Sequence, residues 1–259
     1  MENRRPLILI SNDDSVDAKG IYTLADCCPE DADIVIVAPD TQQSGKSSAL
    51  TVGAPLRITA HPDHGNARVF SVSGTPVDCV KLALHAIVPR KPDLILAGIN
   101  HGSNSGCNVI YSGTMGAVIE GCNEGIVSCG FSILQHSPDP DFSMCAPYVR
   151  SMIARLLAEG LPEGVCLNVN MPARVAPQGV RVCRAARGYW TEEYRKYTDP
   201  SGNPFFWLTG RFVNLEREAV DTDEYWLDNK YIAVVPVMVD YTAHGNIDAL
   251  AERFNSAAE

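Results

Sequence analysis

Residues 7–14, Leu-Ile-Leu-Ile-Ser-Asn-Asp-Asp, join a short apolar run directly to a cluster of polar side chains. Consecutive aliphatic residues of this kind are typical of a strand that is buried on both faces of a parallel sheet. After Gly20, the residues Ile21, Leu24 and Cys28 recur at helical spacing. The opening of the chain therefore predicts a strand, a polar loop and a helix, in that order.

The same arrangement recurs along the chain. The apolar runs 33–39 and 94–99 also end in polar loops, and Thr75 precedes Pro76 in the pattern of a helix N-terminus. Further strands are expected at 56–60, 68–72, 130–134, 165–169 and 231–239, and further helices over 76–87, 115–122 and 145–156. This alternation predicts a doubly wound α/β sheet, in which ligands bind beyond the carboxyl ends of the strands.

The composition limits the kinds of partner. Of 259 residues, 46% are hydrophobic and 20% charged, with a net charge of −10, which is typical of a globular chain. Such acidity argues against binding to duplex nucleic acid or to an anionic membrane. No apolar run is long enough to span a membrane, and residues 7–10 are too short for a secretory signal, so we expect a cytoplasmic protein. The nine cysteines, without C-x-x-C spacing, predict reduced thiols.

The character of the sequence changes at Tyr189. Aromatic residues become frequent, with Gly202 and Pro204 among them, which indicates a hairpin-like extension before the strand 231–239 and a short helix from Asn246. We therefore predict a core of residues 1–188 and a C-terminal β-rich extension of residues 189–259.

Three polar loops, 12–14, 42–45 and 100–104, follow predicted strands and are expected to meet at one sheet edge. The adjacent carboxylates of Asp13 and Asp14 repel each other unless a cation neutralises them, and oxygen ligands suit Mg²⁺ or Mn²⁺. The pair is interpreted as a metal site. The alternative is that it merely caps the following helix.

Ser112-Gly113-Thr114 stands before another predicted helix. Hydroxyls and free backbone N–H groups at a helix N-terminus hold anions, so phosphate fits there, although simple capping is the alternative.

Other motifs give weaker functional predictions. Residues 45–47 resemble the end of a P-loop, but Asp40 occupies the required glycine position. His61 and His64 are expected to be solvated in a polar loop, and His101 either aids proton transfer or lines its loop.

Several ordered blocks resemble the SurE family, the survival-protein 5′/3′-nucleotidases. They are Ile10-Ser11-Asn12-Asp13-Asp14, residues 37–45, Ser73-Gly74-Thr75-Pro76-Val77-Asp78, residues 97–104, Tyr111-Ser112-Gly113-Thr114, residues 167–172 and residues 240–244. The resemblance implies a Rossmann-like three-layer sandwich and a metal-dependent phosphomonoesterase acting on nucleoside monophosphates. It also implies that the C-terminal extension is exchanged between subunits of a homodimer or homotetramer.

Site residues follow from the resemblance position by position. The implied ligands of one divalent cation per subunit, Mg²⁺ or Mn²⁺, are Asp13, Asp14, Ser44 and Asn100, and the implied phosphate-binding residues are Asn104, Ser112, Gly113 and Thr114. Asp13 and Asp14 are also the expected catalytic residues, either by activating water through the cation or with one of them acting as nucleophile or acid–base.

Two positions depart from the family pattern. Ser15 stands where the family has glycine after the Asp-Asp pair, and Asn108 stands where it has aspartate. A positive φ at residue 15 would strain a side chain that carries Cβ, and Asn108 lacks the carboxylate of a base. We expect activity to survive. The alternatives are a non-catalytic, metal-dependent nucleotide-binding module and a broader phosphatase for sugar phosphates or short polyphosphate.

Overall fold

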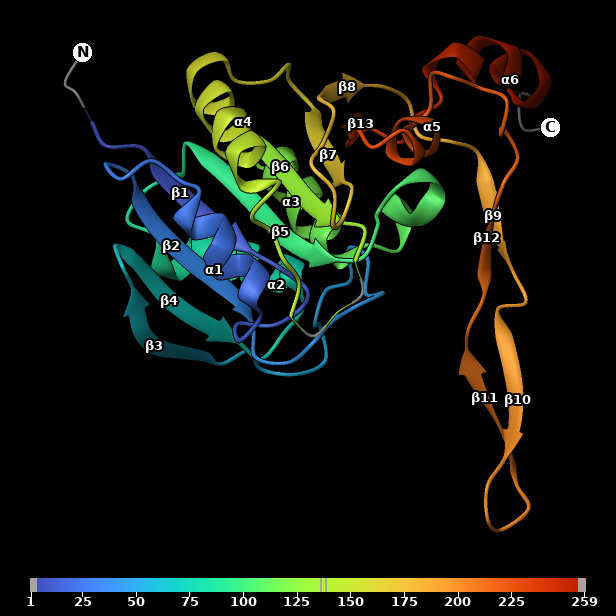
Figure 1. Cartoon of the computed structure of the whole chain (residues 1–259), viewed down its shortest axis with the longest axis horizontal. Helices are drawn as coiled ribbons and strands as arrows, with labels where there is room; N and C mark the ends of the chain where they lie inside the picture. The colour runs from blue at the N-terminus through green and yellow to red at the C-terminus, as the bar shows by residue number, and fades with distance from the viewer. Residues whose placement is uncertain (1–3, 136, 138, 256–259) are drawn as a thin grey trace.

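The computed structural model describes residues 4–135, 137 and 139–255 and has a central nine-stranded sheet (Figure 1). Its strand order is β3-β4-β2-β1-β5-β6-β7-β13-β8, and only β3 and β13 give antiparallel pairs, with β4 and β7. The strands are β1 (Leu7–Ser11), β2 (Asp33–Pro39), β3 (Ile58–His64), β4 (Ala67–Val72), β5 (Leu94–His101), β6 (Ser128–Ile133), β7 (Val165–Met171), β8 (Val180–Val182) and β13 (Ile232–Met238). The predicted, mostly parallel sheet is confirmed.

Helices cover both faces of this sheet and complete three layers. On one face, α1 (Lys19–Asp26) and α4 (Ala146–Glu159) bury Ile21 and Val149 against the strands. On the other face, α2 (Pro76–Leu82), its continuation η1 (Ala83–Ile87) and α3 (Gly113–Asn123) pack in a second apolar cluster. The predicted α/β three-layer sandwich is therefore confirmed.

The start of α2 follows the predicted signal. The Thr75 hydroxyl accepts the Asp78 N–H at 3.1 Å, and the Asp78 carboxylate accepts the Thr75 N–H at 2.9 Å. This reciprocal capping satisfies two backbone donors that a helix leaves unpaired. Asp78 also accepts the Thr51 N–H, so the same cap fixes the long loop between β2 and β3.

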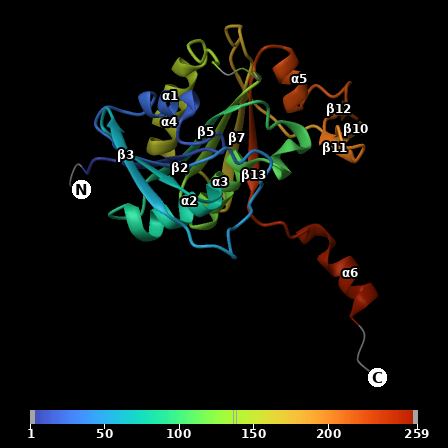
Figure 2. The same cartoon turned by 90° about the horizontal axis from the view of Figure 1, so that it is seen from below.

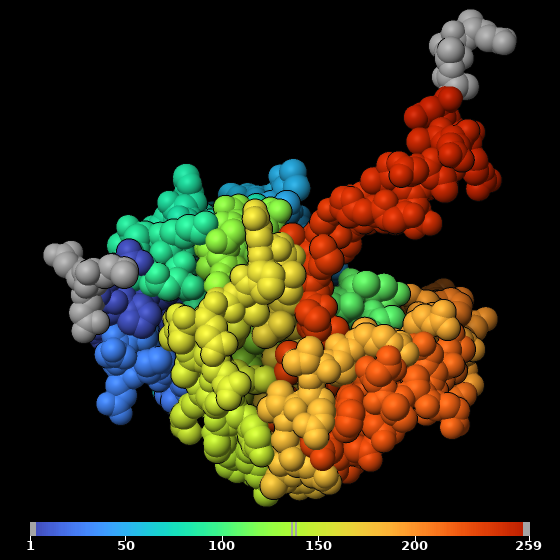
Figure 3. Space-filling model, turned by 90° about the horizontal axis from the view of Figure 1, so that it is seen from above, coloured from blue at the N-terminus to red at the C-terminus, as the bar shows by residue number. Residues whose placement is uncertain are grey.

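The C-terminal part adds an arm, which we define as residues 188–214. Its two-stranded segments pair β9 (Gly188–Thr191) with β12 (Arg211–Asn214) and β10 (Tyr194–Thr198) with β11 (Pro204–Leu208), and they extend well away from the sheet (Figure 1). The chain then forms α5 (Asp223–Asp228), returns to the sheet as β13, and continues through η3 (His244–Asn246) into α6 (Ile247–Phe254). Helix α6 projects from the body of the molecule (Figures 2 and 3).

Several local expectations need correction. His61 and His64 lie in β3 and not in a polar loop, because this edge strand continues beyond the predicted 56–60. His61 Nε2 lies 2.7 Å from Ser71 Oγ, and His64 Nε2 lies 2.7 Å from Asp26 Oδ1. All nine cysteines are free thiols, as expected. Within the described residues, no helix has the length and apolar character needed to cross a bilayer.

Candidate active site

Polar loops meet beyond the carboxyl ends of the neighbouring strands β1 and β5. Between these two strands the order of the sheet changes direction, which is where ligands bind in folds of this class. Asp13 and Asp14 follow β1, and Asn100 lies near the end of β5. The loop after β2 joins them, because the Gln43 N–H donates to the Asp13 carbonyl at 2.7 Å. Helix α1 has Ala18 as its N-cap, without a side-chain cap. The alternative interpretation, in which the two aspartates cap this helix, is therefore wrong.

Asp13 is buried, with 4% of its surface exposed. Its Oδ1 accepts a short hydrogen bond of 2.5 Å from the Thr114 hydroxyl at the start of α3. Burial raises the pKa of Asp13 to about 6; the Thr114 hydrogen bond opposes this shift and the nearby charge of Asp14 adds to it. No Lys or Arg of the described residues pairs with Asp13 to offset the charge of its ionised form.

Gly113 lies directly against Asp13. A Cβ atom at position 113 would be 2.7 Å from Asp13 Cβ and 2.9 Å from its Oδ2. Carbon atoms in contact lie about 3.5–4.0 Å apart, so no larger residue fits without moving this carboxylate. Glycine at this position thus lets the N-terminus of α3 approach the aspartate.

Asp14 faces the loop after β5. Its Oδ2 accepts the backbone N–H of His101 at 3.1 Å, and His101 Nδ1 is 3.8 Å from the same oxygen. The His101 ring stacks on Phe142 with a centroid distance of 6.1 Å, and its buried Nε2 has no hydrogen-bond partner among the described residues. His101 therefore lies within the site, beside Asp14.

The other two predicted metal ligands, Asn100 and Ser44, make no hydrogen bond to either aspartate among the described residues. Asn100 is 8% exposed, and its Nδ2 donates to the Gly102 carbonyl at 3.0 Å, so its Oδ1 is the atom available to a cation. Ser44 is exposed, and its Oγ accepts from Gln42 Nε2 at 3.1 Å. Among the described residues, no hydrogen bond joins Ser44 Oγ to Asp13 or Asp14. Ser44 approaches the site only through the backbone bond of its neighbour Gln43.

The donor set fits a hard divalent cation. Two adjacent, largely buried carboxylates form no ion pair with any Lys or Arg in the described ranges, and only His101 lies within pairing distance of one of them. The nearby buried atoms Ser11 Oγ and Asn12 Oδ1 also lack partners there. Buried carboxylates are normally paired or bound to a metal. An oxygen-rich, sulfur-free set of this kind suits Mg²⁺ or Mn²⁺.

Three of the predicted phosphate-binding residues stand at the N-terminus of α3, and the fourth, Asn104, lies in the loop after β5. Ser112 is the N-cap of α3, where its Oγ accepts the Met115 N–H at 3.0 Å, so capping is real at this position. Thr114 and Gly113 contact Asp13 as described above. Asn104 is 6% exposed, and its Nδ2 donates to Ser132 Oγ at 2.8 Å.

Two buried asparagines of β7 support Asn104 and were not singled out from the sequence. Asn170 Oδ1 accepts the Asn104 N–H at 2.8 Å, and Asn168 Nδ2 donates to the Asn104 carbonyl at 2.8 Å. A third bond of 3.0 Å joins the two asparagines to each other. The available signal was the presence of two amides in an otherwise apolar strand, because a buried amide needs a hydrogen-bond partner.

The two departures from the family pattern have distinct settings. Ser15 has φ of 91°, a conformation that strains a residue with a side chain, and its carbonyl accepts from Asn12 Nδ2 at 2.8 Å. Asn108 Oδ1 accepts the indole N–H of Trp190 at 2.7 Å, which joins it to the arm. Ser15 thus has the positive φ that was considered for this position, and Asn108 contacts the arm.

Comparisons with known proteins agree with this fold. The family model described as survival protein SurE matches residues 8–192. Relatives named 5′-nucleotidase SurE from Phocaeicola vulgatus and Bacteroides thetaiotaomicron are 47% and 48% identical over 250 residues, covering 96% of this chain and 97% and 96% of theirs. The crystal structure of SurE protein from Aquifex aeolicus superposes with a TM-score of 0.81 at 32% identity, covering 96% of this chain and 99% of that one. The chain belongs to the SurE family of survival proteins.

Proposed function

We propose that the chain is a divalent-metal-dependent 5′-nucleotidase that hydrolyses nucleoside monophosphates to nucleoside and phosphate. Relatives that match nearly the whole chain carry the name 5′-nucleotidase SurE. The observation that carries the proposal is the buried Asp13 carboxylate, which lies beside Asp14 and against the N-terminus of α3 without a basic partner in the described part of the chain.

Asp13 and Asp14 would hold the cation, with Ser44 and Asn100 as further ligands and one Mg²⁺ or Mn²⁺ per subunit. The observations above support Asp13 most strongly, because burial makes its ionised form costly unless a cation offsets the charge, and Asp14 lies directly beside it. When bound, the cation supplies positive charge and Lewis acidity at the phosphoryl group. A local positive charge is also what a protein of net charge −10 needs to attract an anionic ester.

The N-terminus of α3 would bind the phosphate. This helix has 11 residues, and its first-turn N–H groups and positive dipole end favour an anion at Ser112, Gly113 and Thr114. Asn104 would add a contact from the neighbouring loop, held by Ser132 and Asn170. These donors are fixed before the reaction, so they can stabilise charge that develops on the transferring group.

Two routes for phosphoryl transfer are open at this site. Solvent water could attack the phosphorus with Asp13 or Asp14 orienting it, or one of these aspartates could attack first. The stereochemical course at phosphorus, followed with a substrate whose phosphoryl oxygens are chirally labelled, separates the two routes. One direct attack by water inverts the configuration at phosphorus, whereas an aspartyl intermediate requires two in-line displacements and retains it.

The proposed activity is tested by measuring phosphate release from a panel of nucleoside monophosphates with Mg²⁺ or Mn²⁺ and with EDTA. We expect release that EDTA abolishes. Metal-dependent nucleotide binding without release would instead identify the non-catalytic module, and faster release from sugar phosphates or short polyphosphate would identify the broader phosphatase. The Asp13→Asn variant controls for contaminating phosphatases.

We also propose that residues 189–259 mediate a homodimer or homotetramer in the cytosol. The support is the exposed apolar surface of the arm and of α6: Tyr194, Phe206, Trp207, Leu208, Ile247 and Phe254. Nine free thiols are consistent with a reducing compartment. Light scattering of the purified protein measures its oligomeric state.

A further inference from the structure

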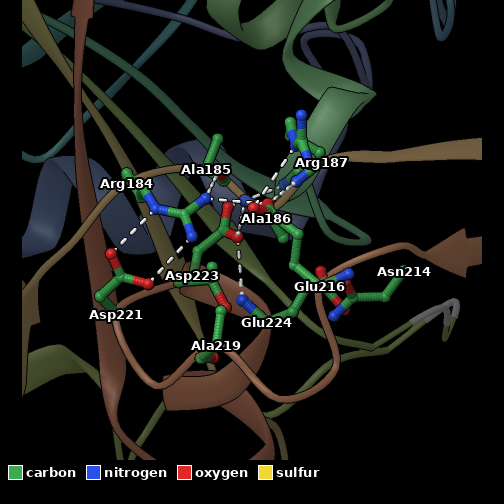
Figure 4. A network of polar contacts seen from close by, with 12 residues as sticks. Arg184, Ala185, Ala186, Arg187, Asn214, Glu216, Ala219, Asp221, Asp223 and Glu224 are labelled. Carbon is green, nitrogen blue, oxygen red and sulfur yellow. Dashed lines mark hydrogen bonds and ion pairs between the residues drawn. The ribbon is translucent and has the colours of Figure 1, made fainter.

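The substrate loop, which we define as residues 102–111, contacts the base of the arm, which we define as β9, β12 and the segments that flank them, residues 184–191 and 211–222. The Gly106 N–H in this loop donates to Asp223 Oδ2 at 2.7 Å. The other oxygen of the same carboxylate accepts the N–H groups of Ala186 and Glu224, both at 2.8 Å. Asp223 is fully buried, so one carboxylate joins the substrate loop, the segment that precedes the arm and α5. Figure 4 shows this carboxylate beside Ala186 and Glu224.

A second connection runs through the aromatic side chains of the arm. Trp190 Nε1 donates to Asn108 Oδ1 at 2.7 Å, and Trp190 packs edge to face on Phe212 with a centroid distance of 6.2 Å. Phe212 in turn lies against the substrate loop, since a Cβ at Gly106 would be 3.0 Å from its Cζ. The loop therefore contacts β9 and β12 as well as α5.

Ion pairs connect the two segments that form the base of the arm. Arg184 binds both oxygens of Asp221, at 2.9 and 3.0 Å, and donates to Glu216 Oε2 at 2.8 Å (Figure 4). Glu216 Oε2 also accepts the Arg187 N–H at 2.7 Å. These contacts join the segment that precedes the arm to the segment that follows it.

We propose that the base of the arm positions the substrate loop for phosphate binding, with Asn108 and Trp190 as positioning residues. The proposal rests on the proposed function, because it assumes that Asn104 in this loop contacts the substrate phosphate. The loop is rich in Gly, Ser and Asn and carries few apolar anchors, so its conformation depends on hydrogen bonds to its neighbours. The Asn108–Trp190 bond supplies one of these from the arm.

The test removes only the indole N–H. Trp190→Phe keeps an aromatic ring against Phe212 but loses the bond to Asn108. We expect KM for AMP and the inhibition constant of inorganic phosphate to rise together by about 2- to 10-fold, with kcat within about twofold, since one hydrogen bond is lost. The matched control is Trp207→Phe, the same change in β11 of the same arm, where the indole makes no hydrogen bond among the described residues and an aromatic ring is retained, so both constants should stay unchanged.

Asn108 supplies the complementary pair of variants. Asn108→Asp retains an acceptor for the indole and should keep the wild-type hydrogen–deuterium exchange of the loop, whereas Asn108→Leu should match Trp190→Phe and add nothing to it in the double variant. Hydrogen–deuterium exchange of peptides from residues 102–111 should rise in both Trp190→Phe and Asn108→Leu. This exchange does not depend on catalysis.

The proposal is overturned if neither KM nor exchange changes, if kcat falls while KM stays constant, or if Trp207→Phe gives the same effects. Failure of the proposed function is a separate result, because it appears as absence of phosphate release in the wild-type protein. In that case the exchange measurement still decides whether the arm holds the loop.

Discussion

Replacing Gly113 by alanine tests the contact between α3 and Asp13. The backbone at position 113 does not have a positive φ, so alanine fits the helix start itself. Its Cβ, however, would lie 2.7 Å from Asp13 Cβ and 2.9 Å from Asp13 Oδ2. The only relief is a movement of the carboxylate or of the helix N-terminus.

The size of the effect follows from these distances. Carbon atoms in contact lie about 3.5–4.0 Å apart, so Asp13 must move by about 1 Å. A misplacement of about 1 Å in a catalytic constellation costs about 100-fold in rate, which corresponds to about 2.7 kcal/mol. We therefore expect kcat/KM for AMP to fall about 100-fold and Mn²⁺ affinity to weaken with it.

Steady-state kinetics and a Mn²⁺ titration followed by electron paramagnetic resonance measure both effects. Gly53→Ala is the matched control, because no heavy atom lies within 4 Å of a Cβ at that position. The thermal midpoint of each variant reports whether the fold survives. Wild-type kcat/KM and Mn²⁺ affinity in a folded Gly113→Ala protein would refute the reasoning.

The same site gives four further expectations. Because burial raises the folded-state pKa of Asp13 to about 6 from 3.8, the metal-free protein should lose up to about 3 kcal/mol of stability as pH rises through this range, as urea unfolding measures. Mn²⁺ affinity should rise over the same range as the proton leaves, and Asp13→Asn should remove both trends. Asn104→Ala should raise KM for AMP more than it lowers kcat, in steady-state assays. Asn170→Leu should raise KM similarly by releasing the Asn104 N–H, and an unchanged KM would exclude that support role.

The central sheet was predictable from local pattern. Runs such as 34–39 and 94–99 are apolar throughout, which is sufficient to recognise a buried parallel strand. The start of α2 was equally predictable, since Thr75 and Asp78 form a capping box and Pro76 stands at the first helical position. Local sequence was sufficient in these cases because the stabilising contacts are themselves local.

Elements that depend on distant contacts were missed. Strand β8 has three residues and α5 has six, too short for a periodic signal. Helix α5 is fixed by Asp223, which bonds Gly106 and Ala186 across 117 and 37 positions of sequence. The edge strand β3 was predicted too short because its exposed polar residues, His61 and His64 among them, do not alternate with apolar ones.

The candidate site was partly predictable for a similar reason. Asp13 and Asp14 follow an apolar strand, which places them at the sheet edge without any knowledge of the rest of the chain. The contacts of Gly113 with Asp13 and of Asn170 with Asn104 join residues 100 and 66 positions apart, and no local pattern contains them. The roles assigned to all of the site residues, in metal binding, catalysis and phosphate binding, stay predictions.

Anomalous diffraction from a crystal soaked in Mn²⁺ and AMP tests the proposed metal site most directly. We expect one anomalous peak per subunit between the carboxylates of Asp13 and Asp14, with the phosphate of AMP or its product at the N-terminus of α3. A crystal with no Mn²⁺ at these two side chains, under conditions in which the enzyme in solution releases phosphate, would contradict the account.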